Sequence, residues 1–316
     1  MAKVVRHLRD GQMEFQKVFS KLCNTKSSWQ AWSDFVEMTA IAISNRFEIR
    51  EQVKQDREER YMSIIGQYSK SEQQIFPELV AILVNALERE QEQDFLGEMF
   101  MALELGSHWK GQFFTPYSIC KAMANINTDD AKDKIASKGW ISIHDPACGA
   151  GATLIAARNH MELIGVGSTQ AFFVGQDIDR TAAMMCYIQL SLLGCAGYVV
   201  IADTLIHPVT GPLLWPNLTE HQDAWFMPQN FTDPTWVLRL SRTWRGLEEE
   251  WEANCHEIAT ATENSHTLTN SVCTNFPDKD REHEEPAADP PEIAAEKQQE
   301  PEIPLIETEI GQLTLF

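Results

Sequence analysis

The strongest constraint on the fold is a set of three short apolar runs that alternate with helical segments in the middle of the chain. Strands are expected at 140–144, 171–175 and 198–202, and helices near 118–126, 152–161 and 180–193. Strand and helix in alternation are typical of a parallel sheet whose strands are joined by crossover helices. The sequence therefore predicts an α/β fold.

Regions of different composition flank this alternating segment. Residues 1–108 have apolar side chains at helical spacing and almost no glycine in their long apolar stretches, which predicts a helical N-terminal region. Residues 109–254 form the expected α/β domain. From Cys255 onward the chain has 14 acidic and 3 basic residues. That composition predicts an acidic disordered linker over 255–311, followed by a short peptide at 312–316.

The bulk composition argues against several classes of protein. The net charge of −20 is unlike that of a protein coated with basic residues for duplex DNA, although local basic patches remain compatible with it. Seven scattered cysteines without a CxxC pair indicate a reduced cytoplasmic protein with no structural zinc site. No signal peptide and no apolar run of membrane-spanning length is visible, so we expect no membrane contact.

A glycine-rich turn follows the first expected strand. The stretch reads HDPACGAGATL, so the strand ends at Asp145, and Gly149 and Gly151 follow within six residues. Glycines let a backbone approach a ligand closely, and the amino end of the next helix offers unpaired N–H groups. Because such turns are common after strands, the feature alone is also compatible with a purely structural role.

Two further acidic residues end the other two strands. Asp177 closes the second strand, where sheets of this kind place the acid that bonds a ribose hydroxyl, and Asp203 closes the third. Three neighbouring parallel strands that each end in an acid favour a cofactor that contains a nucleoside. The alternative is that Asp145 and Asp203 only cap helices.

Four motifs, in their order along the chain, resemble the N6-adenine DNA methyltransferases, particularly the modification subunits of type I restriction systems. They are GQFFTP at 111–116, DPACGAGATL at 145–154, VGQDID at 174–179 and ADTL at 202–205. The resemblance covers about a third of the chain. It implies a Rossmann-like methyltransferase sheet with S-adenosylmethionine as the cofactor.

The resemblance also implies roles for single residues. Asp177 would hold the ribose hydroxyls of the cofactor and Asp203 would meet its adenine. S-adenosylmethionine has no pyrophosphate, so a short turn with acids for the ammonium and the ribose suits it better than a GxGxxG turn. Phe113, Phe114 and Thr115 would lie along the methionine end, and the turn residues Asp145, Cys148, Gly149 and Gly151 would surround the amino acid and the ribose.

The catalytic signature of that family is missing from its expected place. The signature is Asn or Asp followed by Pro-Pro and an aromatic residue, which bind and stack on a flipped adenine. It should end a fourth strand shortly after ADTL, but the stretch from 206 to 231 contains no such sequence. Asp289-Pro290-Pro291 lies in the expected linker and is followed by Glu292.

The best substitute is the strand-like run at 223–228. In it, Trp225 and Phe226 could stack on a base or fill a core, and Asn230 is a polar candidate close by. The chain offers only three or four strands, so the expected sheet is abridged: either a partner completes it, or the protein keeps the cofactor pocket without the reaction. The tryptophans and arginines of 236–251 could hold nucleic acid or pack on the sheet.

The chain ends in QLTLF, which places three large apolar side chains after a long polar stretch. Apolar residues at the tip of a solvated tether are typical of short docking motifs. The peptide resembles the QLxLF motif with which bacterial replication and repair proteins bind the sliding clamp. The resemblance implies that Gln312 hydrogen-bonds the clamp, Leu313 bridges, and Leu315 and Phe316 fill its pocket. A tail that folds back onto the domain, or a chance match, is the alternative.

The leading hypothesis is therefore an S-adenosylmethionine-dependent DNA adenine-N6 methyltransferase-like protein that is recruited to the sliding clamp. A second hypothesis is a catalytically inactive cofactor-binding regulator, because the catalytic tetrapeptide is missing. A third is a modification subunit that needs a separate specificity subunit, since no target-recognition domain is visible in the sequence.

Overall fold

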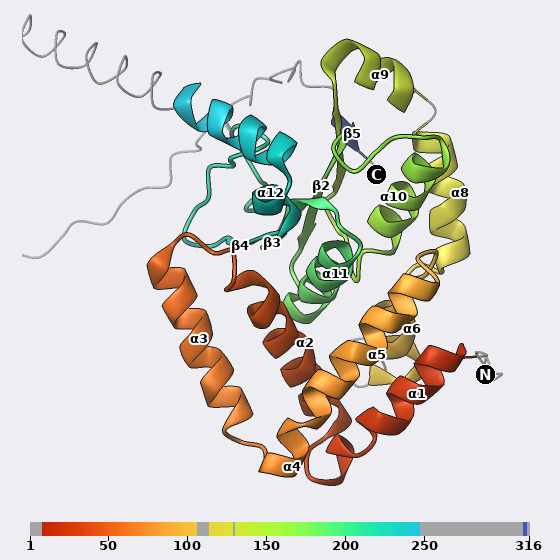
Figure 1. The fold of residues 1–316 in the computed structure, drawn as a ribbon, viewed down its shortest axis with the longest axis vertical. Coiled ribbons are helices and arrows are strands. Elements are labelled where there is room, and N and C mark those ends of the chain that lie inside the picture. Colours follow the sequence, from red (N-terminus) through yellow and green to blue (C-terminus); the bar gives the residue numbers. More distant parts are fainter. Residues whose placement is uncertain (1–7, 106–113, 129, 247–311, 315–316) are drawn as a thin grey trace, which may run out of the picture. The chain divides into compact units, whose positions relative to one another are not determined.

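The computed structural model describes residues 8–105, 114–128, 130–246 and 312–314, the last three by their backbone. Residues 1–244 and 311–316 belong to one compact unit, and 245–310 belong to a second. Figure 1 shows the first unit as a sheet with helices around it and a helical N-terminal layer. None of the described helices is both long and apolar enough to cross a membrane.

The N-terminal region is helical, as predicted. A polar segment separates its last two helices, and Asp94 caps the last helix by accepting the Gly97 N–H at 2.9 Å. Its core is aromatic, with Phe15 in edge contact with Trp32 and Phe35. The helices are α1 (Asp10–Phe19), η1 (Leu22–Asn24), α2 (Ser28–Ser44), α3 (Glu51–Ile65), α4 (Lys70–Gln73), α5 (Ile75–Arg89) and α6 (Phe95–Ala102).

The sheet has the order β4-β3-β2-β1-β5. Its three central strands are parallel to one another, which confirms the predicted α/β fold. The strands are β1 (Ile141–Asp145), β2 (Ala171–Asp177), β3 (Ala196–Ile201), β4 (Asp223–Phe226) and β5 (Gln312–Thr314). The helices of this part are α8 (Tyr117–Asn127), α9 (Ala131–Lys138), α10 (Ala152–Leu163), α11 (Arg180–Leu192), α12 (Gln229–Thr232) and a helix over 234–246.

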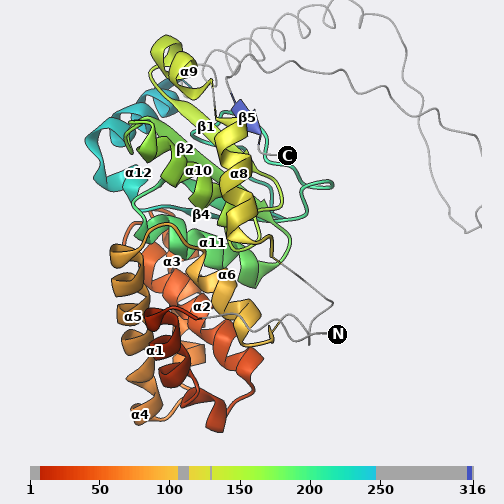
Figure 2. The ribbon, with the colours of Figure 1, turned by 90° about the vertical axis from the view of Figure 1, so that its right-hand side faces the viewer.

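Helix α11 joins the helical layer to the sheet. It contacts α2 and α6 as well as β2 and β3, and Figures 1 and 2 both draw it between the two layers. At its centre the buried Gln189 donates to Asp94 at 2.8 Å and to the Ala150 carbonyl at 2.9 Å. One continuous apolar core therefore runs from the N-terminal helices to the sheet. The expected boundary near residue 108 does not separate two compact units.

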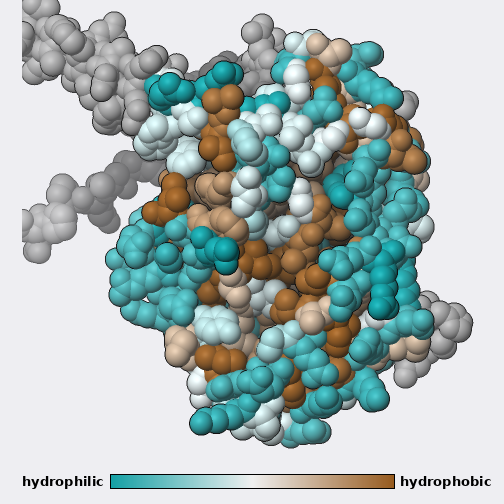
Figure 3. Space-filling model, viewed as in Figure 1, coloured by the Kyte–Doolittle hydropathy of each residue, from teal (hydrophilic) through white to brown (hydrophobic). Residues whose placement is uncertain are grey.

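Strand β4 confirms the strand-like run after residue 222, but it runs antiparallel to β3 at the edge of the sheet. Helix α3 fixes it there. Arg57 lies 3.5 Å from the ring centre of Trp225, and its Nη2 donates to Asp223 Oδ1 and to the Ala224 carbonyl, both at 3.1 Å. Figure 3 shows the rest of α3 as a largely hydrophilic surface, and only Arg57 and Ile64 of this helix are buried.

The other face of the sheet carries a second apolar cluster. Trp236, from the helix over 234–246, is fully buried against Phe172 and donates its indole N–H to the Ser168 carbonyl at 3.0 Å. Arg239 lies over the Trp236 ring at 4.5 Å. The tryptophan face of this helix thus packs on the sheet, which is one of the two interpretations of the sequence. The expected linker at 255–311 lies outside the described residues.

Candidate functional site

The carboxyl ends of β1, β2 and β3 bring the three predicted acids to one edge of the sheet, because the strands are parallel neighbours. Asp145 is buried there. Its carboxylate accepts the Ala147 N–H at 3.0 Å and the Thr153 hydroxyl. Burial raises the pKa of Asp145 above its ordinary value in spite of these bonds.

Asp177 is bound directly to the glycine turn. Its Oδ2 accepts the Gly149 N–H at 2.8 Å and its Oδ1 accepts the Asp179 N–H at 2.8 Å. Burial raises the pKa of Asp177, although its side chain is only half-buried at the end of β2. A hydrogen bond therefore joins the acid at the end of the second strand to the turn after the first strand.

The glycines of the turn are required by its backbone. Gly149 has φ 53° and Gly151 has φ 94°. Residues with a Cβ atom rarely adopt such positive φ values. A Cβ on Gly151 would lie 2.9 Å from the Cys186 Sγ. The Cys148 side chain is buried, and the neighbouring Cys186 thiol, together with burial, raises its pKa. Only the backbone of Cys148 is therefore placed to meet a ligand.

Asp203 closes a turn of its own after β3. Its Oδ1 accepts the N–H groups of Leu205 at 2.9 Å and Ile206 at 3.3 Å. The hydroxyl of Thr204 donates to the Pro146 carbonyl at 2.5 Å, which ties this turn to the turn after β1. Asp203 thus caps a local turn and not a helix, and it also lies half-buried at the same edge as Asp177.

Exposed apolar side chains follow these acids, and the sequence analysis missed them. Ile178 is 70% exposed and Leu205 is 94% exposed. Large apolar side chains at such exposure next to half-buried carboxylates are suited to covering the face of a bound base. The signal available in the sequence was an apolar residue directly after Asp177 and shortly after Asp203.

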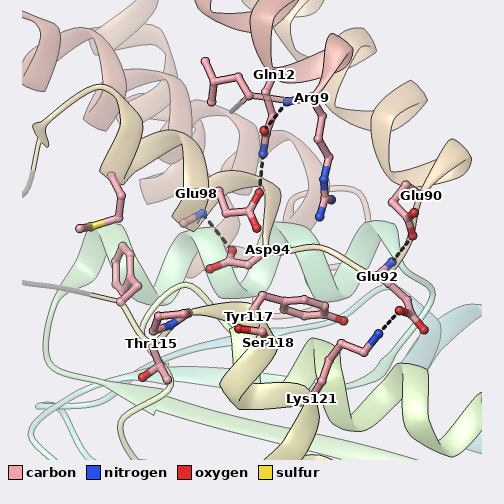
Figure 4. A pocket seen from close by; sticks show the side chains of 15 residues that line it. Arg9, Gln12, Glu90, Glu92, Asp94, Glu98, Thr115, Tyr117, Ser118 and Lys121 are labelled. Carbon is pink, nitrogen blue, oxygen red and sulfur yellow. Dashed lines mark hydrogen bonds and ion pairs between the residues drawn. The ribbon is translucent and has the colours of Figure 1, made fainter. Parts of the chain in front are cut away.

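A cavity of about 750 Å³ lies beside the glycine turn, at the amino end of α8 (Figure 4). Phe114 and Thr115 line it, together with residues of α1, α6 and the segment before α6. The Phe114 ring also lies 3.0 Å from where a Cβ on Gly149 would be, so it stands between cavity and turn. Phe113 lies outside the described residues, and none of the three acids lines the cavity.

The cavity carries more acidic than basic side chains. Asp94 lies in its wall, and burial raises the pKa of this carboxyl to about 6 even though Gln189 and the Gly97 N–H donate to it. Gln12 donates to Glu98 at 2.6 Å, and Lys121 pairs with Glu92, as Figure 4 shows. A cationic or ammonium-bearing group suits this lining better than an anion does.

Residues 93–225 match the family model of the N-6 DNA methylases. A curated relative, the type I restriction enzyme MjaIX methylase subunit of Methanocaldococcus jannaschii, is 30% identical over 110 residues. That match spans 35% of this chain and only 18% of the relative. Both matches support an N6 DNA methyltransferase family for the segment that contains the turn and the acids. A crystal structure from Listeria monocytogenes is assigned to the class I S-adenosylmethionine-dependent methyltransferases. Its match covers 66% of this chain and 58% of the Listeria chain, with 19% identity and a TM-score of 0.37.

The substitutes for the N-6 methylase signature do not lie at this edge of the sheet. Trp225 is 1% exposed beneath Arg57, and the fully buried Asn230 is bound to the backbone of Gly197 at 2.7 and 2.8 Å. Phe226 packs against Tyr198 and Trp215. Strand β4 is separated from β1 by two strands. The structure therefore gives Trp225 and Asn230 packing roles, and it does not bring these candidates to the acids.

Proposed function

We propose that the crevice at the carboxyl ends of β1, β2 and β3 binds S-adenosylmethionine and that the chain is a DNA adenine-N6 methyltransferase-like protein. The observation that carries this proposal is the bond between the Asp177 carboxylate and the Gly149 N–H, which joins strand-end acid and glycine turn within the segment matched by the N-6 methylase family. The match to the N-6 methylase family supports methyl transfer to DNA as the chemistry. The hydrogen bond between Asp177 and Gly149 supports the proposed place of the cofactor.

The described residues fit the parts of this cofactor. Asp177 and Asp203 would accept hydrogen bonds from the ribose hydroxyls and the adenine amine, and Ile178 and Leu205 would cover the adenine. The turn around Asp145 and Gly149 would meet the amino acid, with Phe114 and Thr115 along the methionine end. When bound, the cofactor would supply a methyl group made electrophilic by its sulfonium. The chain's residues would hold and orient that group at the edge of the sheet.

We propose that a partner supplies the part of the site that receives the target adenine of DNA. Among the described residues, the aromatic and amide candidates of β4 and α12 are packed away from the acids. The MjaIX relative is a methylase subunit of a type I restriction enzyme. DNA as the substrate, with a specificity subunit that presents it, is therefore part of the proposal.

Cofactor binding is tested by calorimetric titration of S-adenosylmethionine into the purified chain and into Asp177→Asn. Loss of one charge-assisted hydrogen bond predicts about tenfold weaker binding by the variant. Asp133→Asn on the exposed surface of α9 is the matched control and should bind as the unchanged chain does. Equal affinity for Asp177→Asn, or no binding by the unchanged chain, would refute the assignment of the crevice.

A second function is favoured by the position of β4: a regulator that binds the cofactor without transferring its methyl group. Incubation with labelled S-adenosylmethionine and unmethylated DNA separates the two functions. Label in N6-methyladenine, and its loss in Asp177→Asn, would support the enzyme. Cofactor binding without label in DNA, in the presence and absence of a co-purified specificity chain, would support the regulator.

Recruitment to the sliding clamp is the third part of the proposal and rests on the QLTLF peptide. Gln312, Leu313, Leu315 and Phe316 would make the contacts that its resemblance implies. A chain that lacks 312–316 should lose binding to purified bacterial clamp in surface plasmon resonance and keep its affinity for the cofactor. Undiminished clamp binding by the shortened chain would contradict this part alone.

A further inference from the structure

The C-terminal peptide has a place in the fold as well as a proposed partner. Its backbone forms β5, which pairs in parallel with β1 so that Ser142, Ile143 and His144 lie opposite Gln312, Leu313 and Thr314. The strand enters the sheet after the whole of the segment 247–311, far along the sequence from β1. Figure 2 draws β5 next to β1.

This position creates a reversal in the order of the strands. From β1 the chain adds β2 and then β3 on one side, and β5 returns to the opposite side of β1. In open α/β sheets, ligands bind outside the carboxyl ends of the strands at such a reversal. In this chain the reversal lies between β1 and β5, next to Asp145 and the glycine turn. Without β5, β1 would be an edge strand among the described strands.

The pairing also engages a defined set of backbone groups. The Ile141 N–H donates to the Gln170 carbonyl at 2.9 Å, on the β2 side of β1. Successive N–H groups of a strand point to opposite sides, so those of Ser142 and His144 point towards β5 and that of Ile143 points towards β2. A short strand at a sheet edge can be gained or lost without disturbing the strands beyond it.

We propose that the C-terminal peptide is an exchangeable strand: paired with β1 it completes the crevice beside Asp145, and a partner that binds the peptide must first remove it from the sheet. The peptide thus has two mutually exclusive docking places. The consequence for the cofactor and for the clamp rests on the proposed function, whereas the strand pairing itself does not.

Hydrogen exchange resolved to single amides tests the pairing on the full chain and on a chain without 312–316. We expect exchange at Ser142 and His144 to become about tenfold faster in the shortened chain. The amides of Ile141 and Ile143, which face β2, are the internal controls and should be unchanged. Equal exchange at Ser142 and His144 in both chains would overturn the proposal, whether or not the protein binds S-adenosylmethionine.

Substitutions and a free peptide keep the test independent of the truncation. Leu313→Pro removes an N–H and should speed exchange at Ser142 and His144, and Leu313→Ala, which keeps the backbone, should do so less. A synthetic peptide with the sequence of residues 309–316 should restore protection to the shortened chain, and the same peptide with proline at position 313 should not. Failure of the unmodified peptide to restore protection would count against an exchangeable strand.

The exclusivity is tested by adding purified bacterial sliding clamp to the full chain. If the clamp binds the peptide, exchange at Ser142 and His144 should rise to the values of the shortened chain. Clamp binding with both amides still protected would refute exclusivity. Absence of clamp binding would refute the clamp part of the proposed function, and exclusivity with it, and would leave the pairing to be judged by the truncation and the free peptide.

Discussion

At the scale of single residues, Asp94 connects three parts of the molecule. Its carboxylate caps α6 through the Gly97 N–H, accepts a hydrogen bond from Gln189 of α11 and lies in the wall of the cavity next to Phe114. Gln189 also donates to the Ala150 carbonyl in the glycine turn. A buried carboxyl at this junction makes the stability of the protein depend on pH.

Asp94→Asn should remove part of that dependence. Burial raises the pKa of Asp94 from 3.8 to about 6, so the folded state keeps its proton at pH values where the unfolded chain has lost it. As the pH rises from about 4 to about 6, the free energy of unfolding of the unchanged protein should therefore decrease by up to about 3 kcal/mol relative to that of Asp94→Asn. Urea titrations at several pH values measure this difference. A constant difference between the two proteins across this range would contradict the prediction.

Gly151→Ala should destabilise the turn at the cofactor site. An alanine at φ 94° is strained, and its Cβ would lie 2.9 Å from the Cys186 Sγ and 3.2 Å from the Cys186 Cα. We expect a loss of about 2 to 4 kcal/mol in thermal unfolding. Gly139→Ala has a similar φ of 79° but no atom within 4 Å of the new Cβ, so it should lose only about 1 kcal/mol. Equal losses would show that the contact with Cys186 adds nothing.

At the scale of elements, Arg57 connects α3 to β4. Its guanidinium is nearly buried, bonds Glu48, Asp223 and the Ala224 carbonyl, and stacks on Trp225. Arg57→Ala would remove a nearly buried guanidinium from between Glu48, Asp223 and the Trp225 ring and should lower the free energy of unfolding by about 2 to 4 kcal/mol, because Arg50 and Arg180 still bond its acceptors. Arg60→Ala, on the same helix, removes a half-exposed partner of the buried Glu37, which keeps Arg180 at 3.4 Å, and should cost less than about 1 kcal/mol. Comparable losses for the two variants would argue against this role of Arg57.

The sequence was sufficient to place the central elements but not the direction of β4. Apolar runs and helical periodicity located β1, β2 and β3 and the helices between them to within a few residues. In the structure β4 is held by Arg57, 166 residues before Asp223, and no local pattern records such a contact. In the site, strand-end acids were visible in the sequence, whereas the burial of Trp225 and Asn230 depends on contacts distant along the chain.

At the scale of the whole molecule, the continuous core predicts one cooperative unfolding transition for helices and sheet together. The buried residues of α2, α6 and α11 belong to the same cluster as Ile141 and Ile143 of β1. Far-ultraviolet circular dichroism, which reports helices, and tryptophan fluorescence should therefore follow the same denaturant curve. Two separated transitions would show that the N-terminal layer folds independently of the sheet.

The two edges of the sheet differ in how well they resist aggregation. On β4, the outermost strand on one side, the Ala224 carbonyl accepts guanidinium N–H groups of Arg50 and Arg57, each at 3.1 Å. Cationic side chains bound to an edge strand hinder its pairing with another molecule, which is how many sheets avoid growing into larger assemblies. Among the described residues, the β1 side has the three residues of β5 beside it. Shortening the C-terminus, a common step when a protein is prepared for crystallisation, would therefore uncover the edge at which this protein is most prone to self-association.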